Sequence, residues 1–231
     1  FIFTSLFILE SRGMSKNNAL KNLFLINDKL DWVINERAIA YGSGVHPKHR
    51  LTDYHKFFIK RIKNGDKVLD VGCGNGAVAL SLAKNLPKST IVGIDINQSN
   101  IKLAKTFLNK TNLKNIQFIK GDINQERKIK ADIVILSNVL EHITERVLFL
   151  KKIQKISEAK TFLIRVPYFS RDWKIPLRKE LDLYYFSDND HKIEHSLKEL
   201  ENELLDANLF MNETITKWGE IWTSCSYAKN K

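Results

Sequence analysis

Cysteine is scarce in this chain, because its 231 residues include only Cys73 and Cys225. A fold held together by several disulfides is therefore excluded. This usage is typical of a reducing compartment, so we expect a cytoplasmic protein. Proline and glycine are also few, at four and ten residues, and 43% of the residues are hydrophobic. Such a chain is neither fibrous nor disordered, and its length suits one well-packed α/β domain with additions.

Long hydrophobic runs are absent as well, so no membrane-spanning segment is predicted. The apolar stretch at residues 1–9 is much shorter than the roughly 20 residues that cross a bilayer. It also lacks the basic start and the cleavage site of a signal peptide. Since Met14 would be an ordinary start, we expect residues 1–13 to be disordered or foreign to the native protein. A short helical or interfacial anchor is the alternative.

Acidic residues are outnumbered by basic ones, 26 to 37, which gives a net charge of +11. Such an excess can serve a polyanionic partner such as nucleic acid or an anionic membrane surface. However, the lysines are scattered along the whole chain without a basic block, which favours a solvated lysine-rich surface. Nucleic acid therefore remains the less favoured partner.

The apolar pattern divides the chain into a helical extension at residues 14–50 and one domain at 51–231. Helical periodicity covers 18–40, a loop is expected at 41–48, and a further helix carries Tyr54 to Ile62. Short apolar strands then alternate with helices, which predicts a parallel sheet covered on both faces. Strands are expected at residues 68–71, 90–96, 115–119, 132–136 and 161–166, and helices at 77–85, 99–111 and 141–157.

The last part of the domain changes character. Ser196 and Glu199 have the spacing of a capping box, which predicts a helix that ends near Asp206. Residues 210–218 and 220–227 then predict a β-hairpin that turns at Gly219.

The first predicted strand ends in a glycine-rich loop, Asp70-Val71-Gly72-Cys73-Gly74-Asn75-Gly76. Glycines at alternate positions indicate a tight turn that lets the backbone approach a ligand, as in nucleotide-binding α/β proteins. The pattern from Gly72 to Ala77 alone also fits nicotinamide dinucleotides. Asp70 argues against them, because a carboxylate beside the loop suits a positively charged ligand group and disfavours a pyrophosphate.

The next two strands also end in acids. Asp95 lies about 20 residues past the loop, the spacing at which a carboxylate binds ribose hydroxyls. Asp122 follows the third strand and can accept a hydrogen bond from an exocyclic amine such as that of adenine. Each acid alone is more typical of a turn or a helix cap. The three in order after three strands favour a nucleoside with a positively charged tail.

With this set of motifs, the chain resembles class I S-adenosylmethionine-dependent methyltransferases. The resemblance rests on Asp70-x-Gly72-x-Gly74-x-Gly76, Asp95 and Gly121-Asp122. Asn138-Val139-Leu140-Glu141-His142 resembles the small-molecule, type 11-like branch, and residues 44–55 are similar to bacterial methyltransferases of surface-polysaccharide synthesis. The resemblance implies a Rossmann-like, mostly parallel seven-stranded sheet with helices on both faces and a C-terminal β-hairpin.

The same resemblance implies roles for individual residues in binding S-adenosylmethionine. Gly72, Cys73, Gly74 and Gly76 would pass beneath the methionine part, with Asp70 near its ammonium group. Asp95 would hold the ribose and Ile96 would pack on the adenine. Asp122 would bind the adenine amine, the backbone N–H of Ile123 would lie next to it, and Asn138 would lie beside the sulfonium.

Methyl transfer from a sulfonium depends mainly on alignment of the acceptor, and a base is needed only for a hydroxyl or a protonated amine. The candidate bases are Glu141, His142, His191 and His195. The spacing of His191 and His195 would suit a metal ion if the segment were helical. Because residues 187–190 are more typical of a turn, no metal site is expected.

Residues 168–195 are expected to cover the substrate, because aromatic and charged residues gather there in a way that suits a sugar or an anionic group. The fourth strand is not followed by the Asn/Asp-Pro-Pro-aromatic signature of base-methylating enzymes. We therefore expect methylation of a small-molecule or carbohydrate acceptor at oxygen. The alternative is a basic RNA-binding methyltransferase or a non-catalytic partner protein with the same fold. The sequence does not predict the oligomeric state.

Overall fold

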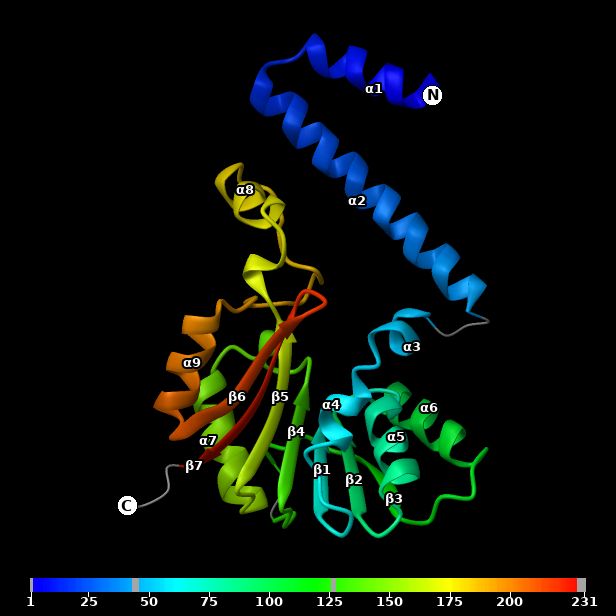
Figure 1. The fold of residues 1–231 in the computed structure, drawn as a ribbon, viewed down its shortest axis with the longest axis vertical. Coiled ribbons are helices and arrows are strands. Elements are labelled where there is room, and N and C mark those ends of the chain that lie inside the picture. Colours follow the sequence, from blue (N-terminus) through cyan, green and yellow to red (C-terminus); the bar gives the residue numbers. More distant parts are fainter. Residues whose placement is uncertain (1, 43–45, 126–127, 228–231) are drawn as a thin grey trace. The chain divides into compact units, whose positions relative to one another are not determined.

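A computed structural model describes residues 2–42, 46–125 and 128–227 (Figure 1). The chain divides into two compact units, one of residues 1–53 with 172–185, the other of residues 54–171 with 186–231. The predicted cover segment, 168–195, is therefore shared between the units. Residues 43–45 of the predicted loop, which include the first two residues of the polysaccharide-type motif, lie outside the described residues.

The larger unit contains a seven-stranded sheet with the order β3-β2-β1-β4-β5-β7-β6. Strands β1 to β5 are parallel, whereas β7 pairs antiparallel with both β5 and β6. The strands are β1 Lys67–Val71, β2 Thr90–Asp95, β3 Ile116–Lys120, β4 Ile133–Ser137, β5 Thr161–Pro167, β6 Leu209–Lys217 and β7 Glu220–Tyr227. This confirms the predicted sheet with its C-terminal hairpin.

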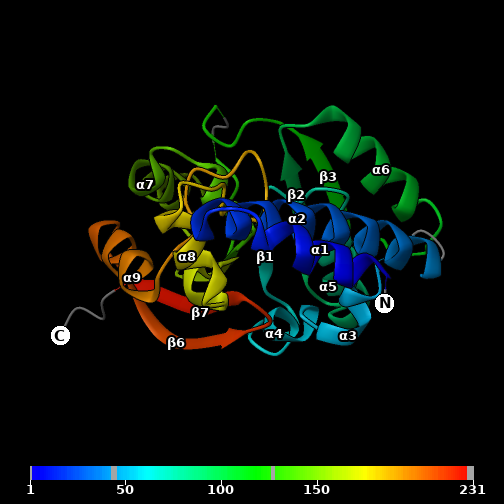
Figure 2. The same ribbon diagram turned by 90° about the horizontal axis from the view of Figure 1, so that it is seen from above.

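Helices cover both faces of the sheet (Figure 2). On one side lie α4 (His55–Ile59), α5 (Ala77–Asn85) and α6 (Gln98–Leu108), and on the other lie α7 (Arg146–Ser157) and α9 (Leu197–Asp206). Successive residues of β1 alternate between the two cores: Val68 packs on the α5 side, and Leu69 and Val71 pack on the α7 side. The pleat therefore places Asp70 on the same face as Val68, toward α5.

Local sequence signals explain where several elements begin and turn. The hydroxyl of Ser196 accepts a hydrogen bond from the backbone of Glu199, whose carboxylate accepts one in return, so the predicted capping box opens α9. The hairpin turns through Trp218 and Gly219, whose φ values of 56° and 76° are both positive. Two such residues between paired strands are typical of a type I′ turn. The hairpin turn predicted at Gly219 is therefore confirmed.

The smaller unit consists of α1 (Ile2–Arg12), α2 (Lys16–Tyr41), α3 (Lys48–Thr52) and α8 (Lys174–Glu180). Arg178 is buried there and donates to the backbone oxygen of Phe24 and to the carboxylate of Asp28. These bonds attach α8 to α2. None of the described helices is both long enough and apolar enough to cross a membrane.

The structure corrects two local expectations. Residues 2–12 form a helix and are not disordered; whether they are foreign to the native protein or serve as an anchor stays a prediction. The helix expected at 141–157 begins only at Arg146, because Ile143 has extended backbone angles (φ −94°, ψ 131°) and packs its side chain against the core. The short 3-10 helix η1, Leu140–His142, precedes this break.

Candidate active site

The glycine loop after β1 has the backbone conformation that its sequence predicts. Gly72, Gly74 and Gly76 have φ values of 67°, 55° and 82°, in the left-handed region that favours glycine. A Cβ atom on Gly76 would lie 2.5 Å from Cζ of Phe118, and one on Gly72 would lie 2.7 Å from Cγ2 of Val139. At Gly74 a Cβ would meet no described atom within 4 Å. The loop is therefore packed at both ends and open in its middle.

Asp70 brings a buried carboxylate to the carboxyl end of β1. Its side chain is 1% exposed, and its Oδ2 atom has no hydrogen-bond partner among the described residues. Burial, and secondly the charge of Asp95, raise the pKa of Asp70 to about 7. A carboxylate in this state gains from a ligand that carries a positive charge, as the ammonium group of S-adenosylmethionine would.

Asp95 ties the end of β2 to the glycine loop. One carboxylate oxygen accepts a hydrogen bond from the backbone N–H of Gly74 at 2.8 Å, and the other accepts from the N–H of Asn97 at 2.7 Å. Between these acids, Cys73 is buried, and burial together with the charges of Asp70 and Asp95 raises the pKa of its thiol. The thiol therefore stays protonated, so Cys73 contributes to the loop by packing and not as a nucleophile.

A cavity of about 210 Å³ opens beside this loop. It brings together Gly72, Asp95, Ile96, Asp122 and Ile123, all of which were predicted to bind the cofactor. Ile96 is 67% exposed at this cavity although it is apolar, as expected for a side chain that stacks on a ligand. The cavity is also lined by Val71, Ile94, Gly121, Asn124, Val139, Ile143 and Phe149.

Two other predicted cofactor contacts have their own local geometry. The carboxylate of Asp122 accepts from the backbone N–H of Asn124 at 2.9 Å and from the side chain of Gln125 at 3.2 Å, so it also organises the turn after β3. Asn138 has a positive φ of 56°, and its side-chain oxygen is buried without a hydrogen-bond partner among the described residues. An unpartnered amide oxygen next to the cavity residue Val139 leaves a contact for a ligand.

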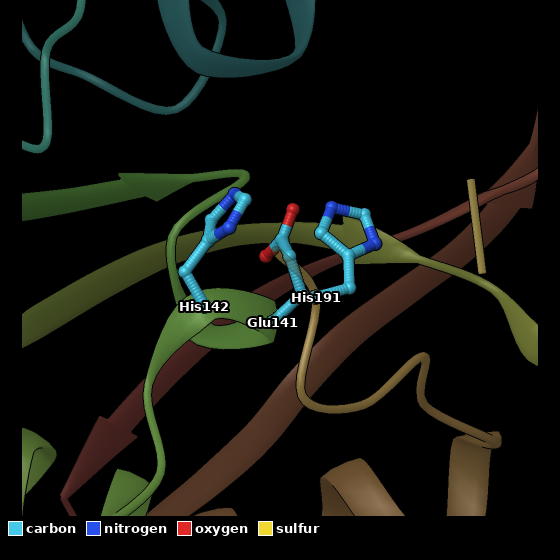
Figure 3. Close-up of side chains that lie close together, drawn as sticks. All are labelled: Glu141, His142 and His191. Carbon is cyan, nitrogen blue, oxygen red and sulfur yellow. The ribbon is translucent and has the colours of Figure 1, made fainter. Parts of the chain in front are cut away.

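The structure brings three of the four candidate bases together (Figure 3). Glu141 and His142 lie on η1, and His191 comes from the loop before α9. The backbone N–H of Lys192 donates to the backbone oxygen of Glu141 at 2.7 Å, which fixes this loop against η1. The rings of His142 and His191 meet edge to face with their centroids 4.8 Å apart. We call these three side chains the Glu-His-His cluster.

His195 lies apart from this cluster, in a buried network of its own. It is 0% exposed, and its Nε2 atom lies 3.0 Å from a carboxylate oxygen of Glu203, which also binds Arg146. Burial alone would raise the pKa of Glu203, but the bonds to His195 and Arg146 outweigh it and lower the pKa to about 2. These contacts join α9 to the start of α7, which is a structural task.

Two functional neighbours were missed from the sequence. Arg165 projects from β5 with its guanidinium 4.3 Å from the ring centre of Tyr54, and it lies 3.0 Å from the carboxylate of Glu220. A single charge in the otherwise apolar run 161–166 was the available signal. Glu194, which binds His191, carried no comparable signal, because acids are common just before a helix.

The sheet order, the glycine loop and the acids at the strand ends define a class I methyltransferase domain. Residues 62–225 match the protein family described as "Methyltransferase domain", and since this is most of the chain, the protein belongs to that family. S-adenosylmethionine is the cofactor of this class, in agreement with the prediction. The finer type 11-like branch stays a prediction.

Similar proteins support the same class. The ribosomal protein L11 methyltransferase of Thermotoga neapolitana is 31% identical over 126 residues, 54% of this chain and 45% of that protein. The chain thus matches less than half the length of this curated relative. The magnesium protoporphyrin IX methyltransferase of Synechocystis PCC 6803, solved with bound SAH, has a TM-score of 0.63 at 16% identity, covering 78% of this chain and 83% of that one.

A further solved structure, an S-adenosylmethionine-dependent methyltransferase of Aquifex aeolicus, has a TM-score of 0.59 at 19% identity, covering 74% of this chain and 88% of that one. At these identities the structural likeness shows the fold alone. The acceptor must therefore be argued from the site.

Proposed function

We propose that this protein transfers a methyl group from S-adenosylmethionine to a hydroxyl oxygen of a small-molecule or carbohydrate acceptor. The observation that carries the proposal is the position of the Glu-His-His cluster. Val139 and Ile143 both line the cavity, and in the sequence they flank the segment that carries Glu141 and His142. Proton-accepting groups therefore lie in the chain between two residues that line the cofactor pocket, where an acceptor would meet the methyl group.

The residues around the cavity fit S-adenosylmethionine, which supplies an activated methyl group when bound. Asp70 offers an unpartnered buried carboxylate oxygen toward a cation, and the open space at Gly74 leaves room for a ligand above the loop. Asp95 and Asp122 offer carboxylates at the strand ends, as a nucleoside requires. With the donor held in this way, the remaining task of the chain is to align the acceptor and remove its proton.

Glu141 is suited to that proton transfer. Burial raises the pKa of its carboxyl to about 7, although nearby His191 and Arg165 partly offset the effect of burial. A group with a pKa near the working pH both accepts and releases protons readily. His142 is about one-third exposed at its side chain, so it can pass the proton on toward solvent. An oxygen acceptor needs this function, whereas a thiolate or a neutral amine does not.

Two other acceptor classes must be weighed. The net charge of +11 favours RNA, and the similarity to ribosomal protein L11 methyltransferases favours a protein amine. The charge is scattered along the chain, and the L11 relatives match it over less than half of their length. A hydroxyl acceptor accounts in addition for a buried proton-transfer group next to the cavity, so we favour it. We also propose that the protein acts in the cytoplasm, since both cysteines are free thiols.

The test measures release of the demethylated cofactor against a panel of nucleotide sugars, glycans, RNA and ribosomal protein. We expect turnover with a hydroxyl-bearing sugar or small molecule, and we expect Glu141→Gln to lower it strongly at unchanged cofactor affinity. Turnover only with RNA or protein would reject the proposed acceptor. RNA binding that collapses between low and moderate salt would identify the nucleic-acid alternative.

A further inference from the structure

The Glu-His-His cluster has a geometry that a proton-transfer site alone does not require. One possible ligand atom from each of Glu141, His142 and His191 lies within 4.8 Å of the ligand atoms of the other two. Figure 3 shows the carboxylate of Glu141 between the two imidazole rings. Three donor atoms that converge from two separate segments form a pocket for one small cation.

The carboxylate of Glu141 is the strongest indication that a cation belongs there. The residue is 0% exposed, and neither carboxylate oxygen has a hydrogen-bond partner among the described residues. A buried charge without partners costs several kcal/mol, and such groups in proteins are paired or bind metal ions. Arg165, whose charge acts on Glu141, lies 3.0 Å from the carboxylate of Glu220 instead. Within the part of the chain that the structure describes, this carboxylate therefore has no direct partner.

His191 is held in the orientation of a metal ligand. Its Nδ1 atom lies 3.2 Å from a carboxylate oxygen of Glu194, which is buried and is itself fixed by Arg171 and by the backbone N–H of Ser187. When Nδ1 donates to this carboxylate, Nε2 keeps its lone pair for the cluster. A histidine that binds a metal through one nitrogen and a carboxylate through the other is the usual arrangement in metalloproteins.

His142 completes the set on the exposed side. Its Nδ1 atom lies 3.1 Å from Oδ2 of Asp190, but without the geometry of a hydrogen bond. Asp190 is exposed, so it can turn toward the cluster or away from it. The opposite side of the cluster is closed by the buried residues Glu141 and His191. A bound ion would therefore have its free coordination positions on the side of His142.

We propose that Glu141, His142 and His191 bind one divalent transition-metal ion, with open positions for oxygen atoms of the methyl acceptor. Two imidazoles and a carboxylate suit zinc, manganese or cobalt better than magnesium or calcium, which prefer all-oxygen sites. When bound, such an ion would help an acceptor hydroxyl lose its proton to water, as it does for a metal-bound water, and Glu141 would then act as a ligand and not as the base. This last step rests on the proposed function, whereas the metal site itself does not.

The experiment measures metal binding directly on the full chain. The protein is stripped with a chelator, dialysed, and titrated with Zn²⁺ by calorimetry and with Co²⁺ by visible absorption. We expect one ion per chain, with cobalt bands that report nitrogen and oxygen ligands. Stripped protein that binds neither ion at equimolar concentrations would overturn the proposal.

Three variants at the site and two controls separate the cluster from other ligands. Glu141→Gln and His191→Asn are expected to weaken binding at least tenfold, and Glu194→Gln, a change behind the ligand, by a similar factor. Glu201→Gln on the exposed face of α9 and His46→Asn in the smaller unit are matched controls that should bind normally. Binding that survives Glu141→Gln and His191→Asn unchanged would place the ion elsewhere and reject the site.

The readouts keep this proposal distinct from the proposed function. Glu141→Gln is close to isosteric and removes a buried charge, so circular dichroism should show a folded variant even if His191→Asn misfolds. Wild-type protein that binds one ion and methylates only amines would support the metal site and reject the hydroxyl acceptor. If the protein binds no metal ion and still methylates hydroxyls after it has been stripped, the hydroxyl acceptor is supported and the metal site is rejected.

Discussion

Asp95 connects β2 to the glycine loop, and its replacement by asparagine tests both the loop and the cofactor site. Each carboxylate oxygen accepts a backbone N–H, from Gly74 at 2.8 Å and from Asn97 at 2.7 Å. In Asp95→Asn one oxygen becomes an NH₂ group, so one of these N–H donors faces another donor. Losing one bond to a charged acceptor in a buried setting costs roughly 2–4 kcal/mol of unfolding free energy.

The same substitution should weaken the binding of the cofactor. If Asp95 holds the ribose, the variant loses at least one charge-assisted hydrogen bond to a hydroxyl, worth roughly 1.5–3 kcal/mol, or a roughly 10- to 150-fold weaker Kd. Asp95→Ala removes both acceptors and is expected to abolish binding. Calorimetry with S-adenosylmethionine measures the affinity, and denaturant titration measures the stability.

Asp132→Asn is a matched control for this prediction. Asp132 also accepts a backbone N–H, from Lys67 at 2.8 Å, but it lies just before β4, at the end of the sheet away from the glycine loop. It is exposed, so its replacement should cost less stability and leave the cofactor affinity unchanged. A folded Asp95→Asn protein with wild-type affinity would refute the ribose assignment.

Four more variants test the rest of the site. Gly76→Ala should lower the unfolding free energy by about 2–4 kcal/mol, because its Cβ would clash with Phe118 at positive φ. Gly74→Ala should lower the unfolding free energy by only about 1 kcal/mol, yet it should weaken cofactor binding, since its Cβ would enter the open space above the loop. Thermal unfolding would compare the stability of the Gly76 and Gly74 variants, and calorimetry would compare their cofactor affinity. Two variants of equal stability and equally weakened affinity would contradict the loop assignment. In the wild type, the folded Asp70 carboxyl keeps its proton to about pH 7, whereas the unfolded one loses it near pH 3.8, so the unfolding free energy should fall by up to about 4 kcal/mol between about pH 4 and pH 7. Asp70→Asn should remove this fall. If Asp70 were ionised in the folded protein, denaturant titrations across this range would show no difference between the variant and the wild type. His142→Ala should lower turnover more than cofactor affinity, and unchanged turnover in steady-state kinetics would remove it from the reaction.

Local signals explain why the sheet was predictable. Strands β1 to β5 are short apolar runs, the first three of them end next to a glycine or an acid, and every strand lies close to its predicted bounds. The turn at Gly219 was visible because a two-residue hairpin turn needs positive φ, which glycine adopts readily. The break in helical structure between His142 and Arg146 was not predictable, because Ile143 interrupts the helix through its packing and not through its helix propensity.

The cluster was only half visible for a related reason. The sequence named Glu141, His142, His191 and His195 on chemical grounds, but it treated His191 and His195 as a pair because they are close in the chain. The fold separates them: His191 joins η1 across a gap of about 50 residues, and His195 turns to Glu203. Contacts at such separations depend on how the loop before α9 crosses the sheet edge, which periodicity does not encode.

Buried and half-buried acids of the larger unit show how the fold distributes electrostatic cost. Glu194 and Glu203 have histidine and arginine partners, and these partners lower their pKa values against the effect of burial. Asp70 and Glu141 each keep an oxygen without a hydrogen bond among the described residues, and burial raises both pKa values to about 7. The paired acids join elements, so their burial serves stability.

The unpaired acids lie where strands β1 and β4 end, and these two strands are neighbours in the sheet. Asp70 is on β1, and Glu141 follows β4 on η1. Stability alone would replace both with apolar residues, because an uncompensated buried charge is costly. The cost is therefore best explained by ligands that the chain binds there, a cation on the cofactor at Asp70 and a proton or a metal ion at Glu141. Asp70→Asn and Glu141→Gln should each raise stability at pH 8 while they lower ligand binding, and a loss of stability in both would contradict this account.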